Sequence, residues 1–345
     1  MEKSVVSDAL DKQKVVVEMI RLLVDEFNCN HQADISQEVG SSAQQTIFSR
    51  EGEQRQISQF LVDNMNSRRS GLMYLCGHPG TGKTSSLNLV LSKIRKNNNS
   101  LLSNNHQLYM YNAMTYSDVK SFALTLHQDL TQGLTGQEVK KLGRSQVDDE
   151  DISQLIAKTL AKSSNSQRDE FGNRSKDVHK IIVIDEVDQF VSNEKAFTLL
   201  VKAILRGSKS ANTNTSIVGI ANSVDLPFKK KHSAIAMRDC QLLFTPYSID
   251  QLTDILEQKI NSKVPQLPMK MKTKQIISMF VNLVDDRAFE FIAKKVAKLN
   301  GDIRVAFDMM KAALSTLADS VSTAKIMPPD NEIRVTYQLL LKIYE

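Results

Sequence analysis

The chain has 345 residues, enough for two or more domains with a sizeable hydrophobic core. Hydrophobic residues make up 41% and charged residues 24% of the sequence, the ordinary mixture of a soluble globular protein, which gives no support for wholesale disorder. No apolar run reaches the length of a membrane span, and the net charge of +5 permits a nucleic-acid partner without demonstrating one.

Cysteine usage and the N-terminus bear on the compartment. The three cysteines, Cys29, Cys76 and Cys240, are odd in number and lack metal-ligand spacing, which favours a reducing compartment over a disulfide framework. The N-terminus lacks the apolar segment of a secretory signal. We therefore expect a cytosolic or nuclear protein with no membrane partner.

Two helices are predicted before the first strand. Residues 4–28 place apolar side chains at helical spacing, among them Val16 and Ile20, and a polar stretch follows to residue 45. Residues 51–65 repeat the pattern, with Ile57 on the apolar face. These patterns predict an N-terminal helix, a linker and then a core helix.

A glycine-rich loop joins the first predicted strand, residues 72–76, to a helix that carries Leu87 and Leu91 at helical spacing. The loop matches the pattern G-x-x-x-x-G-K-[ST] and consists of Gly77, His78, Pro79, Gly80, Thr81, Gly82, Lys83 and Thr84, with Ser85 next. Its glycines let successive backbone N–H groups converge on phosphates, while Lys83 neutralises them and the Thr84 hydroxyl can bind magnesium. Strand, loop and helix together favour a nucleotide site over a glycine-rich turn without a ligand.

Four further strands are predicted at residues 107–112, 180–185, 216–221 and 241–244. They alternate with helical patterns at residues 116–130 and 151–162 and with polar stretches at residues 131–150 and 163–178. The run at 180–185 is continuously apolar and β-branched, which is typical of a strand buried on both faces of a parallel sheet. The alternation predicts a three-layer α/β sandwich with a five-stranded parallel sheet.

From residue 249 onward the pattern is helical throughout. Helices are predicted at residues 249–260, 273–283, 286–299, 302–318 and 332–344. An all-helical block after an α/β block indicates a separate small domain.

Polar side chains at the ends of two predicted strands extend the candidate site. Asp185 is placed to hold magnesium through its water shell, and Glu186 can orient and polarise an attacking water. Asn222 follows a strand whose end should lie beside the phosphate loop, where its amide can hold that water or touch the terminal phosphate. Arg304, at the start of a predicted helix, can reach the phosphates from the helical domain. The alternatives are a pair of helix-capping acids, a strand-end turn residue and a surface arginine.

Several motifs carry a resemblance to a known family. They are Ile-Asp-Glu-Val-Asp-Gln at 184–189, Gly-Ile-Ala-Asn-Ser-Val-Asp-Leu-Pro at 219–227, Phe-Thr-Pro-Tyr-Ser at 244–248 and Gly-Asp-Ile-Arg at 301–304. With the phosphate loop, and in this order between Phe48 and about Ala312, they resemble the initiator branch of the AAA+ ATPases. Within that branch the family of cell division control protein six is the most similar, and the family of the largest origin recognition complex subunit is its near sister.

The resemblance implies roles for the residues already singled out. Lys83 and Thr84 would be the Walker A ligands of ATP and Mg²⁺, and Asp185 and Glu186 would be the Walker B pair, with Asp185 also at the metal. Asn222 would be sensor one. The family therefore assigns catalysis to the same strand ends that the residues themselves point to.

Three weaker assignments also follow from the resemblance. Arg304 would be sensor two, Tyr247 would lie near the adenine, and Lys120, in a helical insertion at residues 112–130, would contact a DNA phosphate. The arginine finger of the sister family has no clear counterpart, because this chain has His232-Ser233 where that family shows Ser-Arg, and the nearest arginine is Arg238.

The resemblance divides the chain into four parts. These are an N-terminal helix and linker at 1–45, a nucleotide-binding domain at 46–247, a helical lid domain at 248–320, and a C-terminal linker and helix at 321–345. Family members end in a DNA-binding winged helix, which we expect to be absent or truncated here, since a single helix is predicted after residue 331.

The implied function is that of an ATP-dependent DNA replication licensing factor in the nucleus. Such a protein hydrolyses ATP, slowly without partners. It joins origin recognition complex subunits on double-stranded DNA, and it promotes loading of the replicative helicase, the minichromosome maintenance complex, with its loading factor. The alternatives are an origin recognition complex subunit of the largest-subunit type, a structural nucleotide binder that does not hydrolyse, and a metabolic or chaperone-type P-loop ATPase. The presence of Glu186 and Asn222 argues against the non-hydrolysing alternative.

Overall fold

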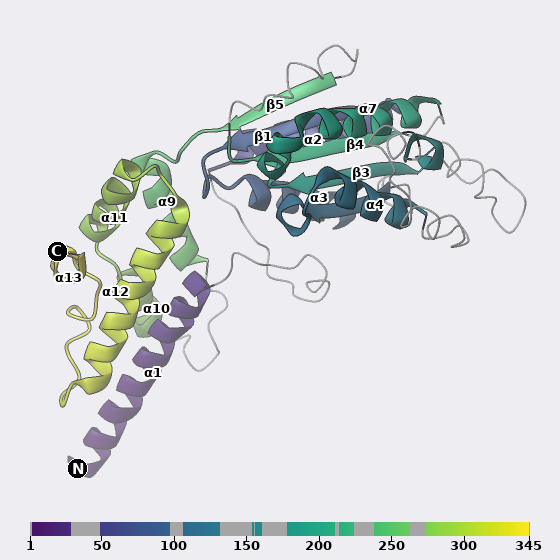
Figure 1. The fold of residues 1–345 in the computed structure, drawn as a ribbon. Coiled ribbons are helices and arrows are strands. Elements are labelled where there is room, and N and C mark those ends of the chain that lie inside the picture. The colour runs from purple at the N-terminus through teal and green to yellow at the C-terminus, as the bar shows by residue number, and fades with distance from the viewer. Residues whose placement is uncertain are drawn as a thin grey trace, which may run out of the picture. The chain divides into compact units, whose positions relative to one another are not determined.

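The computed structural model describes residues 2–28, 49–96, 106–131, 154, 156–160, 178–210, 214–223, 238–262 and 274–344. The chain divides into two compact units (Figure 1). The sheet unit comprises Arg50–His78 and Gly82–Thr245, and the helical unit comprises Met1–Ser49, Pro79–Thr81 and Pro246–Glu345.

The sheet unit contains five parallel strands. They are β1 (Gly71–Gly77), β2 (His106–Asn112), β3 (His179–Asp185), β4 (Thr215–Ala221) and β5 (Arg238–Phe244), in the order β2-β3-β4-β1-β5. The predicted five-stranded parallel sheet is confirmed. Because the strands are parallel, the carboxyl ends of β1, β3 and β4 meet at one edge of the sheet, with β4 between the other two.

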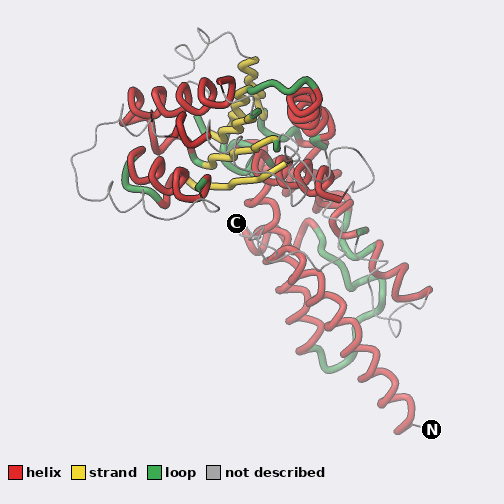
Figure 2. Tube along the Cα trace, turned by 90° about the vertical axis from the view of Figure 1, so that its right-hand side faces the viewer, coloured by secondary structure: helices red, strands yellow, loops and turns green. Residues whose placement is uncertain are grey.

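Helices cover both faces of the sheet (Figures 1 and 2). They are α2 (Glu51–Asn66) and α3 (Lys83–Lys96) on one face, and α4 (Val119–Leu130) and α7 (Glu194–Ser210) on the other. Successive side chains of a strand point to opposite faces, so in β1 Met73 and Leu75 pack with α2 and α3, while Leu72 and Tyr74 join the core on the other face. This alternation with apolar residues on both faces explains the continuous apolar runs in the sequence.

The helical unit has six described helices. They are α1 (Glu2–Asn28), α9 (Ile249–Asn261), α10 (Lys274–Val281), α11 (Asp286–Lys298), α12 (Ile303–Thr323) and α13 (Tyr337–Tyr344). Helix α1 lies antiparallel along α12: Gln13 Nε2 donates to the carbonyl of Val321 at 2.6 Å, and the rings of Phe27 and Phe307 meet at 5.6 Å (Figure 1). The N-terminal helix therefore shares the core of the C-terminal helices, which its sequence alone did not indicate.

Two helix starts differ by three residues or more from the sequence prediction, and α7 was not predicted. The helix expected from residue 332 begins at Tyr337, because Val335 pairs with the chain at Val284: its N–H donates to the Leu283 carbonyl at 2.7 Å, and its carbonyl accepts from Asp285 at 3.0 Å. The helix expected from residue 116 begins at Val119, since the Asp118 carboxylate caps it by accepting from the N–H of Ser121 at 2.7 Å.

Parts of the predicted organisation fall outside the described residues. These are the linker that follows α1, nearly all of the polar stretches at 131–150 and 163–178, and part of the helix predicted at 151–162, of which residues 154 and 156–160 are described and helical. None of the helices in the described part of the chain is long and apolar enough to cross a membrane.

Candidate nucleotide-binding site

The phosphate loop leaves β1 through a residue that must be glycine. Gly77 has φ +152°, and a Cβ there would lie 2.3 Å from the carbonyl oxygen of Phe244 at the end of the neighbouring β5. Gly80 and Gly82 have φ of +71° and +87°, in the left-handed region that favours glycine. The loop thus turns sharply into the N-terminus of α3, where backbone N–H groups are free of helical partners and suited to phosphate.

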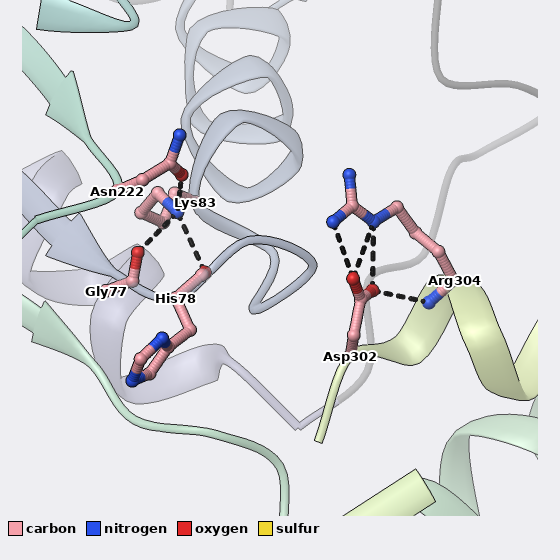
Figure 3. Close-up of polar contacts among 6 residues, drawn as sticks. All are labelled: Gly77, His78, Lys83, Asn222, Asp302 and Arg304. Carbon is pink, nitrogen blue, oxygen red and sulfur yellow. Dashed lines mark hydrogen bonds and ion pairs between the residues drawn. The ribbon is translucent and has the colours of Figure 1, made fainter. Parts of the chain in front are cut away.

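The ammonium group of Lys83 is held at the base of this loop. It donates to the carbonyls of Gly77 at 2.8 Å and His78 at 2.9 Å and to Oδ1 of Asn222 at 3.0 Å (Figure 3). All three acceptors are neutral oxygens, and the side chain is 6% exposed. These contacts orient the ammonium group at the base of the loop, where a cation suits an anionic ligand.

Two oxygens suited to magnesium face each other between α3 and the end of β3. The Thr84 hydroxyl donates to Oδ2 of Asp185 at 3.1 Å, and the N–H of Glu186 donates to Oδ1 of Asp185 at 2.9 Å. Burial raises the pKa of Asp185, an effect that these two donors and the Lys83 charge oppose. Mg²⁺ takes one or two protein oxygens together with phosphate and water oxygens, so Thr84 and Asp185 fit it. Among the described residues no larger cluster of His, Cys, Asp and Glu could hold a metal.

Glu186 and Asn222 complete the arrangement. Glu186 adopts the left-handed conformation (φ 55°, ψ 42°), and its Oε2 accepts from Nδ2 of Asn222 at 2.6 Å. Burial raises the pKa of the Glu186 carboxyl, and the charges of Asp185 and Asp188 add to the rise. Because β4 lies between β1 and β3, the amide of Asn222 spans from Lys83 to Glu186.

The helical unit carries two of the candidate residues, Arg304 and Tyr247. Arg304 lies in the first turn of α12, and its guanidinium pairs with the carboxylate of Asp302, with Nη2 at 2.5 Å and Nε at 2.9 Å (Figure 3). Its side chain is 40% exposed. Tyr247 is 4% exposed in the helical core, and its N–H lies 3.1 Å from where a Cβ of Gly301 would stand. The sensor and adenine roles of these residues stay predictions.

The remaining predicted positions fall into three groups. In the loop, Thr81 is fully buried, while Pro79 and Ser85 are exposed. Lys120 is half-buried in the first turn of α4, and its DNA contact stays a prediction. His232-Ser233 lies outside the described residues, and of Arg238 only the backbone, in β5, is described.

Two residues with evident structural roles were not singled out in the sequence. Asp188 accepts from the N–H of Asn222 at 2.6 Å, and it is the third acid of the motif at 184–189. Arg50 is 1% exposed, pairs with Glu53 at 2.6 Å and donates to the Thr245 carbonyl. The motif was a usable signal for Asp188, whereas nothing local distinguished Arg50 from a surface arginine.

Comparison with known proteins places this geometry in a family context. A sequence model described as "AAA domain" matches residues 64–224, which include the phosphate loop, the Asp185-Glu186 pair and Asn222. The chain has an AAA+ fold and resembles the AAA+ replication initiators. A cell division control protein 6 homolog of Homo sapiens is 25% identical over 320 residues, covering 91% of this chain and 49% of that protein. Origin recognition complex subunit 1 of Dictyostelium discoideum is 22% identical over 285 residues, covering 81% of this chain and 39% of that protein.

Solved structures show the same fold. One match is a chain in the structure of the Drosophila origin recognition complex bound to DNA, with a TM-score of 0.63 and 19% identity. The alignment covers 95% of the present chain and 65% of the Drosophila chain. Another match is the Aeropyrum pernix ORC1 protein in complex with DNA, with a TM-score of 0.55 and 20% identity. The alignment covers 86% of the present chain and 65% of the Aeropyrum chain. The chain spans 49% of the length of the human relative and 39% of that of the Dictyostelium relative. The expected resemblance to the AAA+ replication initiators is thus confirmed, and the match to an AAA domain implies nucleotide binding.

Proposed function

We propose that this protein binds ATP with Mg²⁺ and hydrolyses it. The observation that supports this most directly is the hydrogen-bonded chain from Lys83 through Asn222 to Glu186, with Thr84 and Asp185 beside it. A phosphate loop alone supports binding only. Hydrolysis also needs a carboxylate that acts on water next to the phosphates, and Glu186 supplies it.

Each residue has a defined task in this proposal. Lys83 and the loop N–H groups bind the phosphates, and Thr84 and Asp185 would hold Mg²⁺, which when bound neutralises the phosphate charge. Glu186 orients a water and takes its proton, and burial, which raises the pKa of this carboxyl, makes it a stronger base. Asn222 holds Glu186 and Lys83 in register.

The cellular function that fits the relatives is replication licensing. The curated relatives named above are a cell division control protein 6 homolog and an origin recognition complex subunit 1. We infer that ATP closes this chain onto origin recognition complex subunits and double-stranded DNA in the nucleus, so that the replicative helicase, the minichromosome maintenance complex, is loaded with its loading factor. Arg304 would act there as sensor two, Tyr247 at the adenine, and Lys120 at DNA.

An origin recognition complex subunit is the second candidate. The matches to origin recognition complex subunit 1 in Dictyostelium discoideum and Cricetulus griseus, at 22% and 24% identity, favour it nearly as strongly. Co-purification separates the two functions. A licensing factor should join a preassembled origin recognition complex only with ATP and then recruit the helicase, whereas a subunit should co-purify with the complex without nucleotide.

The ATPase proposal is tested with two variants, at Lys83 and Glu186, and with a control on α3, the helix that begins at Lys83. Lys83→Ala should weaken binding of fluorescent ATP by roughly 100-fold, because a charged hydrogen bond to phosphate is lost. Glu186→Gln should bind ATP normally but slow hydrolysis by about 100-fold or more, since the amide cannot take the proton. Lys93→Ala, at an exposed position near the end of α3, should match wild type. Turnover by Glu186→Gln at the wild-type rate, with partner complex present, would contradict the proposed role of Glu186.

A further inference from the structure

Asp188 makes a contact that joins the end of β4 to the turn after β3. It is the second residue of the 3₁₀ helix η2 (Val187–Asn193), which follows Glu186 directly. Its Oδ2 accepts from the N–H of Asn222 at 2.6 Å, and its Oδ1 lies 3.4 Å from the N–H of Ser223. One carboxylate therefore receives two successive N–H groups of the chain that carries Asn222.

The sheet itself does not provide an acceptor at this point. The ladder between β1 and β4 ends at the pair Cys76 and Ala221, and the ladder between β3 and β4 ends at Ile184 and Gly219. The N–H of Asn222 lies one residue beyond the first ladder and three residues beyond the second. A backbone N–H needs a partner when it is withdrawn from water, and a carboxylate is a stronger acceptor than a carbonyl.

The backbone before Asp188 explains why its side chain reaches β4. Glu186 is in the left-handed conformation, and the N–H of Gln189 donates to the Glu186 carbonyl at 3.0 Å, so the chain reverses within four residues. Val187 is fully buried in the core beneath the turn. With Val187 fixed in this way, Asp188 is directed at the adjacent strand end.

We propose that Asp188 is a positioning residue for Asn222. It fixes the backbone from which the Asn222 side chain bridges Lys83 and Glu186, so that both ends of the catalytic arrangement keep their spacing. The inference rests on the proposed ATPase function and deepens it, because it names the group that sets the geometry of the strand-end amide.

Asn222 depends on such an anchor because its side chain is short. Its amide contacts Lys83 at 3.0 Å and Glu186 at 2.6 Å at the same time, and only two side-chain torsions separate it from the backbone. A backbone shift of about 1 Å would break one contact or both, and misplacements of that size cost up to roughly 100-fold in rate. ATP binding depends mainly on the loop N–H groups and Lys83, so affinity should change little.

Two substitutions at Asp188 separate this role from a general effect of its charge. Asp188→Ala removes both acceptors, while Asp188→Asn removes the charge but keeps one oxygen for the shorter bond to Asn222. Asp118→Ala is the matched control, because Asp118 also accepts a backbone N–H in the sheet unit, at 2.7 Å, but caps α4 instead. Asp188→Ala should lower kcat by roughly 10- to 100-fold with Kd for ATP within about two-fold of wild type. Asp188→Asn should retain most of the activity.

Three kinetic outcomes would overturn the inference. They are an unchanged kcat in Asp188→Ala, an equal loss in Asp118→Ala, and an Asp188→Asn variant as slow as Asp188→Ala. The last outcome would show that charge matters and the hydrogen bond does not.

Amide hydrogen exchange tests the anchor without relying on hydrolysis. In nucleotide-free protein, the peptide that contains Asn222 and Ser223 should exchange faster in Asp188→Ala than in wild type or Asp118→Ala, with Asp188→Asn intermediate. If wild-type protein binds ATP but never hydrolyses it, the ATPase proposal fails, while this measurement still decides the inference. Equal exchange in Asp188→Ala and wild type would overturn it.

Discussion

At the residue scale, His179 is an ionisable group buried at the end of the sheet opposite the phosphate loop. It is 5% exposed, its Nε2 lies 2.9 Å from the Ser216 hydroxyl, and its Nδ1 has no hydrogen-bond partner among the residues that the structure describes. Burial lowers the pKa of His179 to about 4, and the charges of His106 and Lys180 contribute. The folded protein therefore holds this imidazole neutral.

This burial predicts a loss of stability in mild acid. The folded-state pKa lies below the unfolded value of about 6.5, so the unfolded chain takes up a proton first as the pH falls. The stabilisation is complete above that value and is lost between about pH 6.5 and pH 4, with a loss of about 2 kcal/mol between pH 7 and pH 5. Urea unfolding followed by circular dichroism at the two pH values measures it. His179→Gln should remove most of the difference, whereas the control His106→Gln should keep most of it. An equally large acid effect in His179→Gln would exclude His179 as its source.

At the scale of elements, α1 belongs to the core of the helical unit. Leu23 is fully buried on the face toward α12, while its neighbour Leu22 is 39% exposed. Leu23→Ala should destabilise the helical unit by about 2–5 kcal/mol, because it removes buried methyl groups and leaves a cavity. Leu22→Ala should change stability by less than about 0.5 kcal/mol. Thermal unfolding measures both, and equal melting temperatures for the two variants would show that α1 does not contribute to this core.

Arg50 connects the start of α2 to the end of β5. Its buried guanidinium pairs with Glu53, donates to the Thr245 carbonyl and lies 5.4 Å from the centre of the Phe244 ring. The chain passes between the two units next to this contact, at Ser49–Arg50 and at Thr245–Pro246. Arg50 therefore ties together two segments that are far apart in the sequence.

The Arg50 contact should not tolerate lysine. A lysine ammonium cannot reproduce the planar fork that reaches Glu53 and Thr245 together, so Arg50→Lys should destabilise the sheet unit by about 1–3 kcal/mol. Arg55→Lys, at an exposed position on α2, is the control and should be nearly neutral. Differential scanning calorimetry distinguishes them. If Arg50→Lys and Arg55→Lys had the same melting temperature, the contacts of Arg50 with Glu53 and Thr245 would have no net effect on stability.

At the scale of the whole molecule, the chain forms two compact units with separate cores, and we predict that nucleotide couples them. Arg304 is the candidate link, since the family resemblance predicts a sensor-two role for it and its side chain is 40% exposed. We predict that ATP reduces the radius of gyration of wild-type protein in small-angle scattering and that Arg304→Ala weakens this change. Arg287→Ala, at an exposed position on α11, is the control. Equal compaction in Arg304→Ala and wild type would remove Arg304 from the nucleotide response.

Local patterns were sufficient for the strands, for most of the helices and for the chemistry of the loop, but they did not predict α7. Alternation and apolar runs predict β1 to β5, and the glycines of the loop are required by backbone geometry alone, as Gly77 and Gly80 show. Because the strands are parallel, the acids and the amide at their ends had to meet at one edge. The sequence therefore predicted that Lys83, Asp185 and Asn222 lie at one site.

Long-range packing decided which elements lie together, because an amphipathic pattern does not specify the surface against which its apolar face packs. The apolar stripe of α1 predicts a helix but not its place along α12, and Arg50 becomes buried only because β5 ends beside it. The local pattern predicts a helix at residue 335, but Val335 pairs with Val284, and its backbone hydrogen bonds go to that segment instead. The hydrogen bond from the N–H of Asn222 to Asp188 likewise depends on the left-handed conformation of Glu186 and on the strand order, which places β4 next to β3. The sequence by itself determined which groups the site contains, and the tertiary structure decided which of them hold the others in place.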